Sequence, residues 1–167
     1  MAVSLNLFGM ETVENKLSVH FSSRKIEWST PQDVFDSLNI EFGFTTDVCS
    51  THENAKCENH YTIEEDGLSR KWTGVCWCNP PYARNVMAKW VRKAYDSSLS
   101  GATVVCLIPA RTDTKMWHNY IWDKSRHEPR KDVQIRYVEG RLKFSGCKDS
   151  APFPSAVVIF RPKGING

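Results

Sequence analysis

The sequence lacks any apolar run long enough to cross a bilayer. Its first residues also lack the basic flank, apolar centre and small-residue cleavage site of a signal peptide. Neither sign of charge dominates: the formal net charge is +3, which permits nucleic acid as a partner but does not require it. We therefore expect a cytoplasmic protein that does not associate with a membrane.

A cysteine spacing typical of disulfide-rich domains is also missing. The six cysteines are scattered along the chain, and Cys76 and Cys106 lie inside apolar runs. A reduced cysteine in such a run behaves as a small apolar side chain. We therefore expect no disulfide framework.

Four of the possible metal ligands are close together in sequence: Cys49, His52, Cys57 and His60. Their side chains suit tetrahedral zinc, but the Cys-x2-His-x4-Cys-x2-His spacing is not that of a common zinc finger, and no glycine turn separates the pairs. The alternatives are a zinc site and a polar loop that carries incidental histidines. We predict the polar loop and no metal.

The length of 167 residues and the 41% hydrophobic content suit one compact domain. Residues 1–20 show no sustained period and are predicted to be a loosely ordered lead-in, so the domain covers residues 21–167. We predict a first helix over residues 31–38, in which Thr30 is the N-cap and Pro31 the first helical residue. A second helix is predicted between Tyr82 and Gly101, and a third over residues 113–122.

Strand patterns alternate with these helices. They cover residues 42–48, 75–78, 102–109, 133–139, 141–144 and 155–160, while residues 50–72 are polar and give no clear assignment. The run at 102–109 is apolar throughout, which is typical of a strand buried on both faces. The order predicts a three-layer α/β fold whose sheet is mostly parallel and ends in a C-terminal antiparallel hairpin.

The segment Asn79-Pro80-Pro81-Tyr82 follows the strand at 75–78 and precedes a helix. The two prolines fix backbone torsions and remove donors, so the backbone there offers carbonyl oxygens in a preset geometry. Asn79 adds a side-chain acceptor, and Tyr82 offers a flat face for a heterocycle. A proline-rich surface turn is the ordinary interpretation, but the full tetrapeptide at a strand end predicts a site that binds a planar amine.

Several ordered motifs add to this tetrapeptide, and together they resemble the small phage and prophage DNA N6-adenine methyltransferases of the Dam type. The resemblance covers about residues 20–161. Its motifs are Glu27-Trp28-Ser29-Thr30-Pro31, Phe44-Thr45-Thr46-Asp47-Val48-Cys49, Asn54-Ala55-Lys56, Asp66-Gly67-Leu68, Trp77-Cys78-Asn79-Pro80-Pro81-Tyr82, Leu107-Ile108-Pro109-Ala110-Arg111-Thr112-Asp113 and Gly140-Arg141-Leu142-Lys143-Phe144.

The resemblance implies a Rossmann-like methyltransferase fold and transfer of a methyl group from S-adenosyl-methionine to adenine N6 in DNA. The Asn79 side-chain oxygen and the Pro80 carbonyl would accept hydrogen bonds from N6, which draws its lone pair out of the ring and toward the methyl group. Because N6 is not reachable inside a duplex, the base would flip out and stack on Tyr82. The implied setting is a bacterial host cell, where methylation would protect phage DNA from restriction.

The cofactor residues are also carried over from the resemblance. Thr30 and Pro31 match the segment beside the methionine moiety, Asp47 would meet the methionine ammonium or the ribose, and Asp66 would meet the cofactor adenine. Asp47 stands near the carboxyl end of a predicted strand, where ligands of open α/β sheets bind. The full predicted cofactor set is Trp28, Thr30, Pro31, Asp47, Cys49, Asn54, Asp66, Gly67, Leu68 and Asn79.

One departure from the family concerns the segment after the first predicted strand. Methyltransferases usually carry a glycine-rich loop there, because close approach of the backbone to the cofactor requires glycine. Residues 47–51 contain no glycine. The residue that binds the ribose hydroxyls has no clear match either, and its candidates are Glu53, Asn54, Glu64 and Glu65.

Basic residues near the later strands are candidates for DNA contact. Arg111 follows the buried strand and Arg141 follows a turn, and each suits either a phosphate contact or a structural ion pair. A basic cluster between the third helix and the next strand is either a solvated loop or a recognition segment. The predicted DNA-binding set is Arg111, Lys124, Arg126, Arg130 and Arg141.

Two other functions compete with this one. The amine could be cytosine N4, an RNA adenine or a protein glutamine, because all of these are planar conjugated amines. A non-catalytic nucleic-acid-binding module built around the Cys/His cluster is the other alternative, but the presence of both Asn79 and Tyr82 opposes it.

Overall fold

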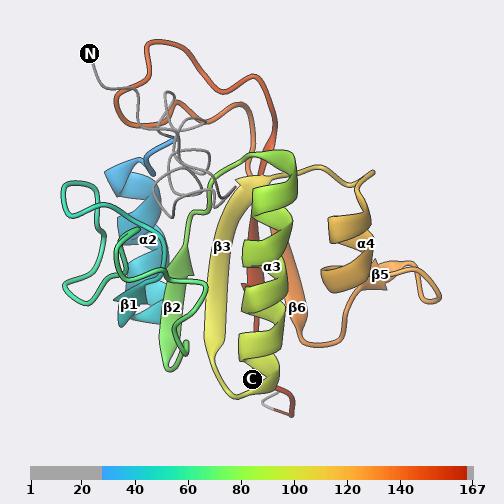
Figure 1. Ribbon diagram of the computed structural model, residues 1–167. Helices are drawn as coiled ribbons and strands as arrows, with labels where there is room; N and C mark the ends of the chain where they lie inside the picture. The colour runs from blue at the N-terminus through green and yellow to red at the C-terminus, as the bar shows by residue number, and fades with distance from the viewer. Residues whose placement is uncertain (1–27, 165–167) are drawn as a thin grey trace, which may run out of the picture.

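The computed structural model describes residues 28–164, and its centre is a five-stranded mixed sheet with strand order β1-β2-β3-β7-β6 (Figure 1). The strands are β1 (Thr46–Asp47), β2 (Val75–Cys78), β3 (Thr103–Pro109), β6 (Val133–Tyr137) and β7 (Ser155–Phe160). The first three are parallel, while β7 is antiparallel to both β3 and β6. The predicted α/β fold with its antiparallel C-terminal pair is confirmed. The predicted lead-in at residues 1–20 lies outside the described residues.

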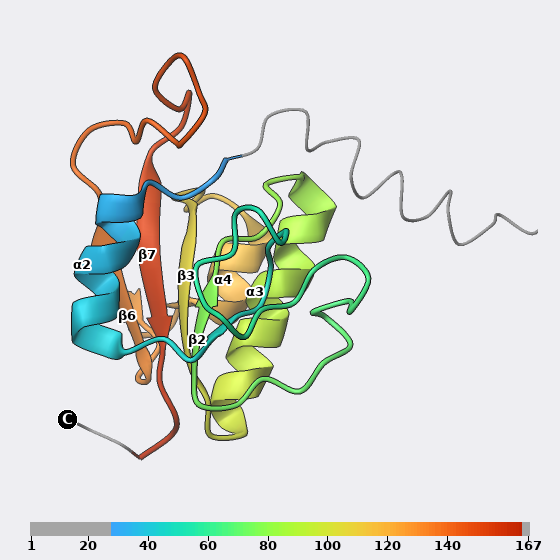
Figure 2. The ribbon, with the colours of Figure 1, turned by 90° about the vertical axis from the view of Figure 1, so that its left-hand side faces the viewer.

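Helices cover both faces of the sheet and make three layers. Figure 2 shows α2 (Gln32–Phe42) on one face and α3 (Arg84–Leu99) with α4 (Lys115–Tyr120) on the other. Side chains of β3 alternate between the two faces: Val104, Cys106 and Ile108 join the core under α3 and α4, while Val105 and Leu107 join the core under α2. Because both faces are buried, the strand needs apolar residues throughout, as its sequence predicted.

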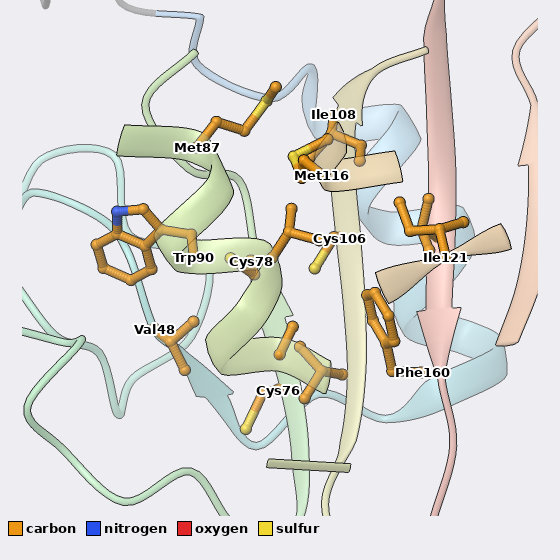
Figure 3. Close-up of a cluster of buried hydrophobic side chains, with 14 of the residues drawn as sticks. Val48, Cys76, Cys78, Met87, Trp90, Cys106, Ile108, Met116, Ile121 and Phe160 are labelled. Carbon is orange, nitrogen blue, oxygen red and sulfur yellow. The ribbon is translucent and has the colours of Figure 1, made fainter. Parts of the chain in front are cut away.

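The core under α3 and α4 is shown in Figure 3. Trp90 and Met87 of α3 and Met116 of α4 lie over Cys78 and Cys106 of the sheet. These two cysteines are fully buried on adjacent strands, and both are reduced. They therefore act as small apolar side chains in the layer between sheet and helices.

The helices differ from prediction mainly at their ends. The helix α2 continues to Phe42 and stops at Gly43, which has a left-handed φ of 62° and donates its backbone N–H to Asn39. Its N-cap is Pro31, not Thr30, and no side chain caps it. The Thr30 cap was a wrong prediction, because the Thr30 hydroxyl is bonded to Asn79 instead. The helix α4 starts after Thr114, whose hydroxyl accepts a hydrogen bond from Trp117 N at 3.3 Å.

Two strand predictions were wrong. Residues 42–48 form a strand only at Thr46–Asp47, because Phe42 belongs to α2. Residues 141–144 do not form a strand: β6 pairs directly with β7, and residues 138–154 form a long loop between them, here called the 138–154 loop. Its backbone bonds are scattered: Ala151 N bonds Leu142 O within the loop at 2.8 Å, and Ser145 N bonds Ser29 O at 2.8 Å, so residues 141–144 have no continuous strand partner.

Two further segments were not assigned from sequence. Part of the 50–72 stretch runs beside the sheet edge, where Asp47 exchanges backbone hydrogen bonds with Asn59 and Tyr61. A short hairpin is formed by β4 (Trp122–Asp123) and β5 (Glu128–Pro129). Within residues 28–164, no helix is both long and apolar enough to span a membrane.

Candidate active site

A cavity of about 380 Å³ opens at the carboxyl end of the three parallel strands. Such an edge gathers ligand-binding residues because several strands end there together. Ten of the residues predicted from sequence as catalytic, cofactor-binding or DNA-binding lie on its wall. They are Trp28, Thr30, Asp47, Cys49, Asn54, Asn79, Pro80, Pro81, Tyr82 and Arg111.

The side-chain amide of Asn79 is held in one orientation. Its Nδ2 atom donates one hydrogen bond to the Trp28 carbonyl at 2.7 Å and another to the Thr30 hydroxyl at 2.9 Å. Both amide hydrogens are therefore engaged, and a rotated amide would set its oxygen against the Trp28 carbonyl, which cannot donate. The Oδ1 atom is left as the acceptor on the other side of the group.

The Tyr82 hydroxyl contacts that acceptor. It donates to Asn79 Oδ1 at 2.8 Å and lies 3.3 Å from the Leu107 carbonyl oxygen. Burial raises the pKa of Tyr82 well above its ordinary value of 10.0, so the hydroxyl stays a donor. Because an amide oxygen has two lone pairs, Asn79 Oδ1 can accept a second hydrogen bond beside the one from Tyr82.

The ring of Tyr82 belongs to an aromatic cluster on the cavity wall. The Trp28 ring is nearly parallel to it, with an interplanar angle of 20° and centroids 6.4 Å apart. Phe144 and Phe153 meet the Tyr82 ring edge to face at 6.0 and 5.4 Å. Both phenylalanines come from the 138–154 loop, so this loop fixes the ring that follows the two prolines.

Asp47 brings a buried carboxylate to the cavity wall. Its Oδ1 accepts from Cys49 N at 3.2 Å and its Oδ2 from Lys56 N at 3.0 Å. Burial raises the pKa of the Asp47 carboxyl above its ordinary value of 3.8, while the two backbone amides act in the opposite direction. The carboxylate is thus oriented by the loop that follows β1.

Ser50 is a wall residue that the sequence analysis missed. Its side chain is 4% exposed, and its hydroxyl has no hydrogen-bond partner among the described residues. A buried hydroxyl without a partner costs free energy, so its place on a cavity wall indicates a position for a polar ligand atom. The only sequence signal was its place three residues after Asp47, beyond the strand end.

The other predicted cofactor residues lie away from the wall. Pro31 precedes α2, and Asp66 is an exposed turn residue with a φ of 49°. Gly67 lies behind the wall: a Cβ atom there would come within 2.2 Å of the Val48 carbonyl oxygen, so only glycine fits. Leu68 packs against the core under α3. The cofactor roles of these four residues stay predictions.

The candidates for the ribose ligand are also separated. Asn54 lies on the wall, and its Oδ1 accepts from Thr51 N at 2.8 Å. Glu64 and Glu65 instead lie on either side of the Thr62 hydroxyl, which can donate its hydrogen to either carboxylate, and neither belongs to the cavity lining, nor does Glu53. Among the four candidates, Asn54 is therefore the one in position.

The Cys/His cluster has a different arrangement from a zinc site. His52 Nδ1 and His60 Nε2 share a hydrogen bond of 2.9 Å, and His60 Nδ1 bonds the Glu58 carbonyl at 2.8 Å. Both ring nitrogens of His60 are thus occupied by protein groups. In the described part of the chain, no three His, Cys, Asp or Glu residues are grouped as metal ligands.

The predicted DNA-binding residues fall in four places. Arg111 is exposed on the cavity wall, and Arg141 is exposed in the 138–154 loop. Lys124 and Arg126 lie in the turn of the β4–β5 hairpin, where Arg126 pairs with Glu128. Arg130 is turned inward: it donates to the Asn119 carbonyl at 2.8 Å and lies over the Tyr95 ring. The DNA-binding roles of these residues stay predictions.

Comparison with known proteins gives one family and two relatives. The family model described as DNA N-6-adenine-methyltransferase (Dam) matches residues 18–164. The DNA N-6-adenine-methyltransferase of Escherichia phage T1 is 33% identical over 90 residues, which are 52% of this chain and 37% of that protein. YfdM of Escherichia coli (strain K12), which has the word methyltransferase in its name, is 36% identical over 64 residues, 34% of this chain and 70% of that protein. The match therefore spans little more than a third of the phage T1 relative.

Proposed function

Because the chain belongs to the DNA N-6-adenine-methyltransferase (Dam) family, we propose that it transfers a methyl group from S-adenosyl-methionine to the N6 atom of adenine in DNA. The phage T1 relative carries this activity in its name. The cavity at the carboxyl end of the parallel strands is the site that we assign to the reaction.

The observation that carries the proposal is the fixed orientation of the Asn79 amide. With Nδ2 bound to Trp28 and Thr30, Oδ1 is the atom offered to an incoming amine. The N6 lone pair of adenine is delocalised into the ring, and hydrogen bonds from N6 to Asn79 Oδ1 and the Pro80 carbonyl oxygen would return electron density to the nitrogen. An acceptor that is already oriented needs no reorganisation as the reaction proceeds.

The base reaches this acceptor only after it leaves the duplex. We assign Tyr82 as the ring on which the flipped adenine stacks, with Trp28 nearly parallel to it on the same wall. Stacking of a base on an aromatic ring is worth about 1–3 kcal/mol, which offsets part of the cost of unstacking. Once methyl transfer is complete, N6 releases a proton to water.

The remaining wall residues suit the methyl donor, which when bound supplies an electrophilic methyl group on a sulfonium sulfur. Asp47 offers a buried carboxylate that suits an ammonium group, and Ser50 offers a buried hydroxyl that lacks a partner. Asn54 and Cys49 complete this part of the wall. These wall residues therefore fit the polar end of S-adenosyl-methionine, and we assign them to its binding.

The test is to incubate the protein with unmethylated DNA and isotopically labelled S-adenosyl-methionine and to identify the modified nucleoside. We expect N6-methyl-2′-deoxyadenosine, and no label with the Asn79→Ala variant. Label in N4-methylcytosine, in RNA or in protein would show that the methyl acceptor is another planar amine. Transfer to none of these acceptors would rule out the proposed methyl transfer. Resistance of the methylated DNA to restriction enzymes would test the protective role, which stays a prediction.

A further inference from the structure

The 138–154 loop forms one side of the cavity mouth. Pro152 and Phe153 lie on the cavity wall. Ser145 donates its backbone N–H to Ser29 O at 2.8 Å, beside the segment that orients Asn79. Figures 1 and 2 show the loop rising above the end of the sheet at which β3 terminates. The loop therefore borders the entrance through which a base would pass.

Its inward side chains anchor it to the site. Phe144 and Phe153 are buried, and their rings lie 5.3 and 5.1 Å from the Trp28 ring. Leu142 and Ala151 pack in the same core under α2. Because these apolar contacts and the Ser145 hydrogen bond hold it, the position of the loop is fixed relative to Asn79 and Tyr82.

Its outward side chains include three cations. Arg141, Lys143 and Lys148 are exposed, and they alternate with or follow the buried anchors. The loop also carries two carboxylates, Glu139 and Asp149, so three cations stand against two anions. Two more exposed arginines border the cavity from other elements: Arg84 follows the wall residue Ala83, and Arg111 is on the wall itself.

Among the residues that the structure describes, none of these five cations is in an ion pair. The ion pairs found within residues 28–164 are Arg92 with Asp96, Arg126 with Glu128, and Arg136 with Glu41. A nucleotide flipped into the cavity stays attached to its two flanking phosphates, which must then lie at the cavity mouth. Exposed cations on a loop that borders the cavity suit those phosphates.

We propose that the 138–154 loop is the element that binds the DNA backbone beside the flipped nucleotide, through Arg141, Lys143 and Lys148. The proposal rests on the proposed function, because it takes DNA as the substrate. It makes the loop both a wall of the active site and its principal DNA contact, so that backbone binding and base placement depend on one rigid element.

The basic cluster in and beside the β4–β5 hairpin (Lys124, Arg126, Arg130 and Lys131) is poorly placed for this role. Figure 1 shows it beyond α4, on the side of the molecule away from the 138–154 loop. Arg126 is paired with Glu128, and Arg130 is bound to Asn119 and Tyr95. The hairpin therefore provides a matched control for the loop.

The experiment compares two triple variants with equal charge change, Arg141→Gln/Lys143→Gln/Lys148→Gln in the loop and Lys124→Gln/Arg126→Gln/Lys131→Gln near the hairpin. Binding to sheared, unmethylated duplex DNA is measured over a range of salt concentrations. For the loop triple we expect weaker binding and a log–log salt slope that is shallower by up to about 0.9 for each lost phosphate contact. Binding of S-adenosyl-methionine and the melting temperature should not change. For the hairpin triple we expect wild-type binding and slope.

Two outcomes would overturn the proposal alone: a wild-type slope in the loop triple, or an equal loss in the hairpin triple, while the wild-type protein still methylates DNA. A wild-type protein that neither binds DNA in a salt-dependent way nor methylates it would overturn the proposed function as well. The wild-type measurements therefore separate the two failures.

Discussion

The Thr30 hydroxyl oxygen accepts a hydrogen bond from Asn79 Nδ2 across 2.9 Å, and this bond joins residues that are 49 positions apart in the chain. Thr30 is 2% exposed, so this hydrogen bond is buried. The bond fixes which end of the Asn79 amide is offered as an acceptor. A residue that looked like a helix cap thus acts as a positioning residue for the proposed catalytic amide.

Replacing Thr30 by Val should remove this acceptor while keeping the side-chain shape. Loss of a buried hydrogen bond costs about 1–3 kcal/mol, and we expect kcat to fall about tenfold or more, with a smaller change in KM. The variant Thr30→Ser keeps the hydroxyl and should recover most of the loss. Equal impairment in both variants, or full activity in Thr30→Val, would contradict the positioning role. Steady-state kinetics measure kcat and KM for the two variants, and calorimetry measures how tightly each binds S-adenosyl-methionine.

Asn79→Asp should impair both stability and activity, because the carboxylate places an oxygen opposite the Trp28 carbonyl, which now lies 2.7 Å from Nδ2. Two acceptors facing each other without a proton repel, and we expect a loss of about 1–3 kcal/mol in the free energy of unfolding. The loss should shrink at acidic pH, where the protonated carboxyl can donate to Trp28. Thermal unfolding of the variant and the wild type at several pH values tests this, and a loss that does not depend on pH would oppose it.

Ser50→Ala should affect the protein alone and its donor complex in opposite ways. Removing a buried hydroxyl that has no partner should leave the unliganded protein unchanged or stabilise it by about 1 kcal/mol, while the donor is bound less tightly. Melting temperatures without ligand, together with calorimetry of S-adenosyl-methionine binding, give both quantities. An unchanged donor affinity would remove Ser50 from the donor site.

The raised pKa of Asp47 predicts a pH dependence with a definite sign. Because burial favours the protonated carboxyl in the folded state, its contribution to stability is present below the ordinary value of 3.8 and is lost as pH rises through the raised pKa. Binding of a donor ammonium needs the ionised form, so donor affinity should increase with pH over the same window. Calorimetry in buffers above pH 3.8 measures the trend, and Asp47→Asn should abolish it.

Gly67→Ala should destabilise the fold, because the added Cβ would meet the Val48 carbonyl oxygen at 2.2 Å. The backbone at Val48, between the wall residues Asp47 and Cys49, must then shift. Overpacking of this kind costs about 1–3 kcal/mol. Gly140→Ala is a suitable control: it has a φ of 72° but nothing within 4 Å, so only backbone strain of about 1–2 kcal/mol applies. Donor affinity should fall in Gly67→Ala and stay unchanged in the control.

Local sequence patterns determined several elements of the fold and the central segment of the candidate site. The apolar run of β3, the helical spacing of α3 and the Asn79–Tyr82 segment were all identified from sequence, because burial on two faces, amphipathic period and proline restriction act on neighbouring residues. The family followed from the order of the motifs. The strand, the helix and the Asn79–Tyr82 segment each depend on residues close together in the chain, so they can be predicted from the sequence alone.

The tertiary structure decided what each polar group is bonded to. Thr30 has the sequence of a cap but bonds Asn79, and residues 141–144 have a strand pattern but serve as an anchored loop. Ser50 and Phe153 became wall residues only because β1 and the 138–154 loop end beside the same cavity. Hydrogen bonds and packing contacts between distant segments outweigh local preference, because a buried polar or apolar group gains more from its partner than from its own backbone conformation.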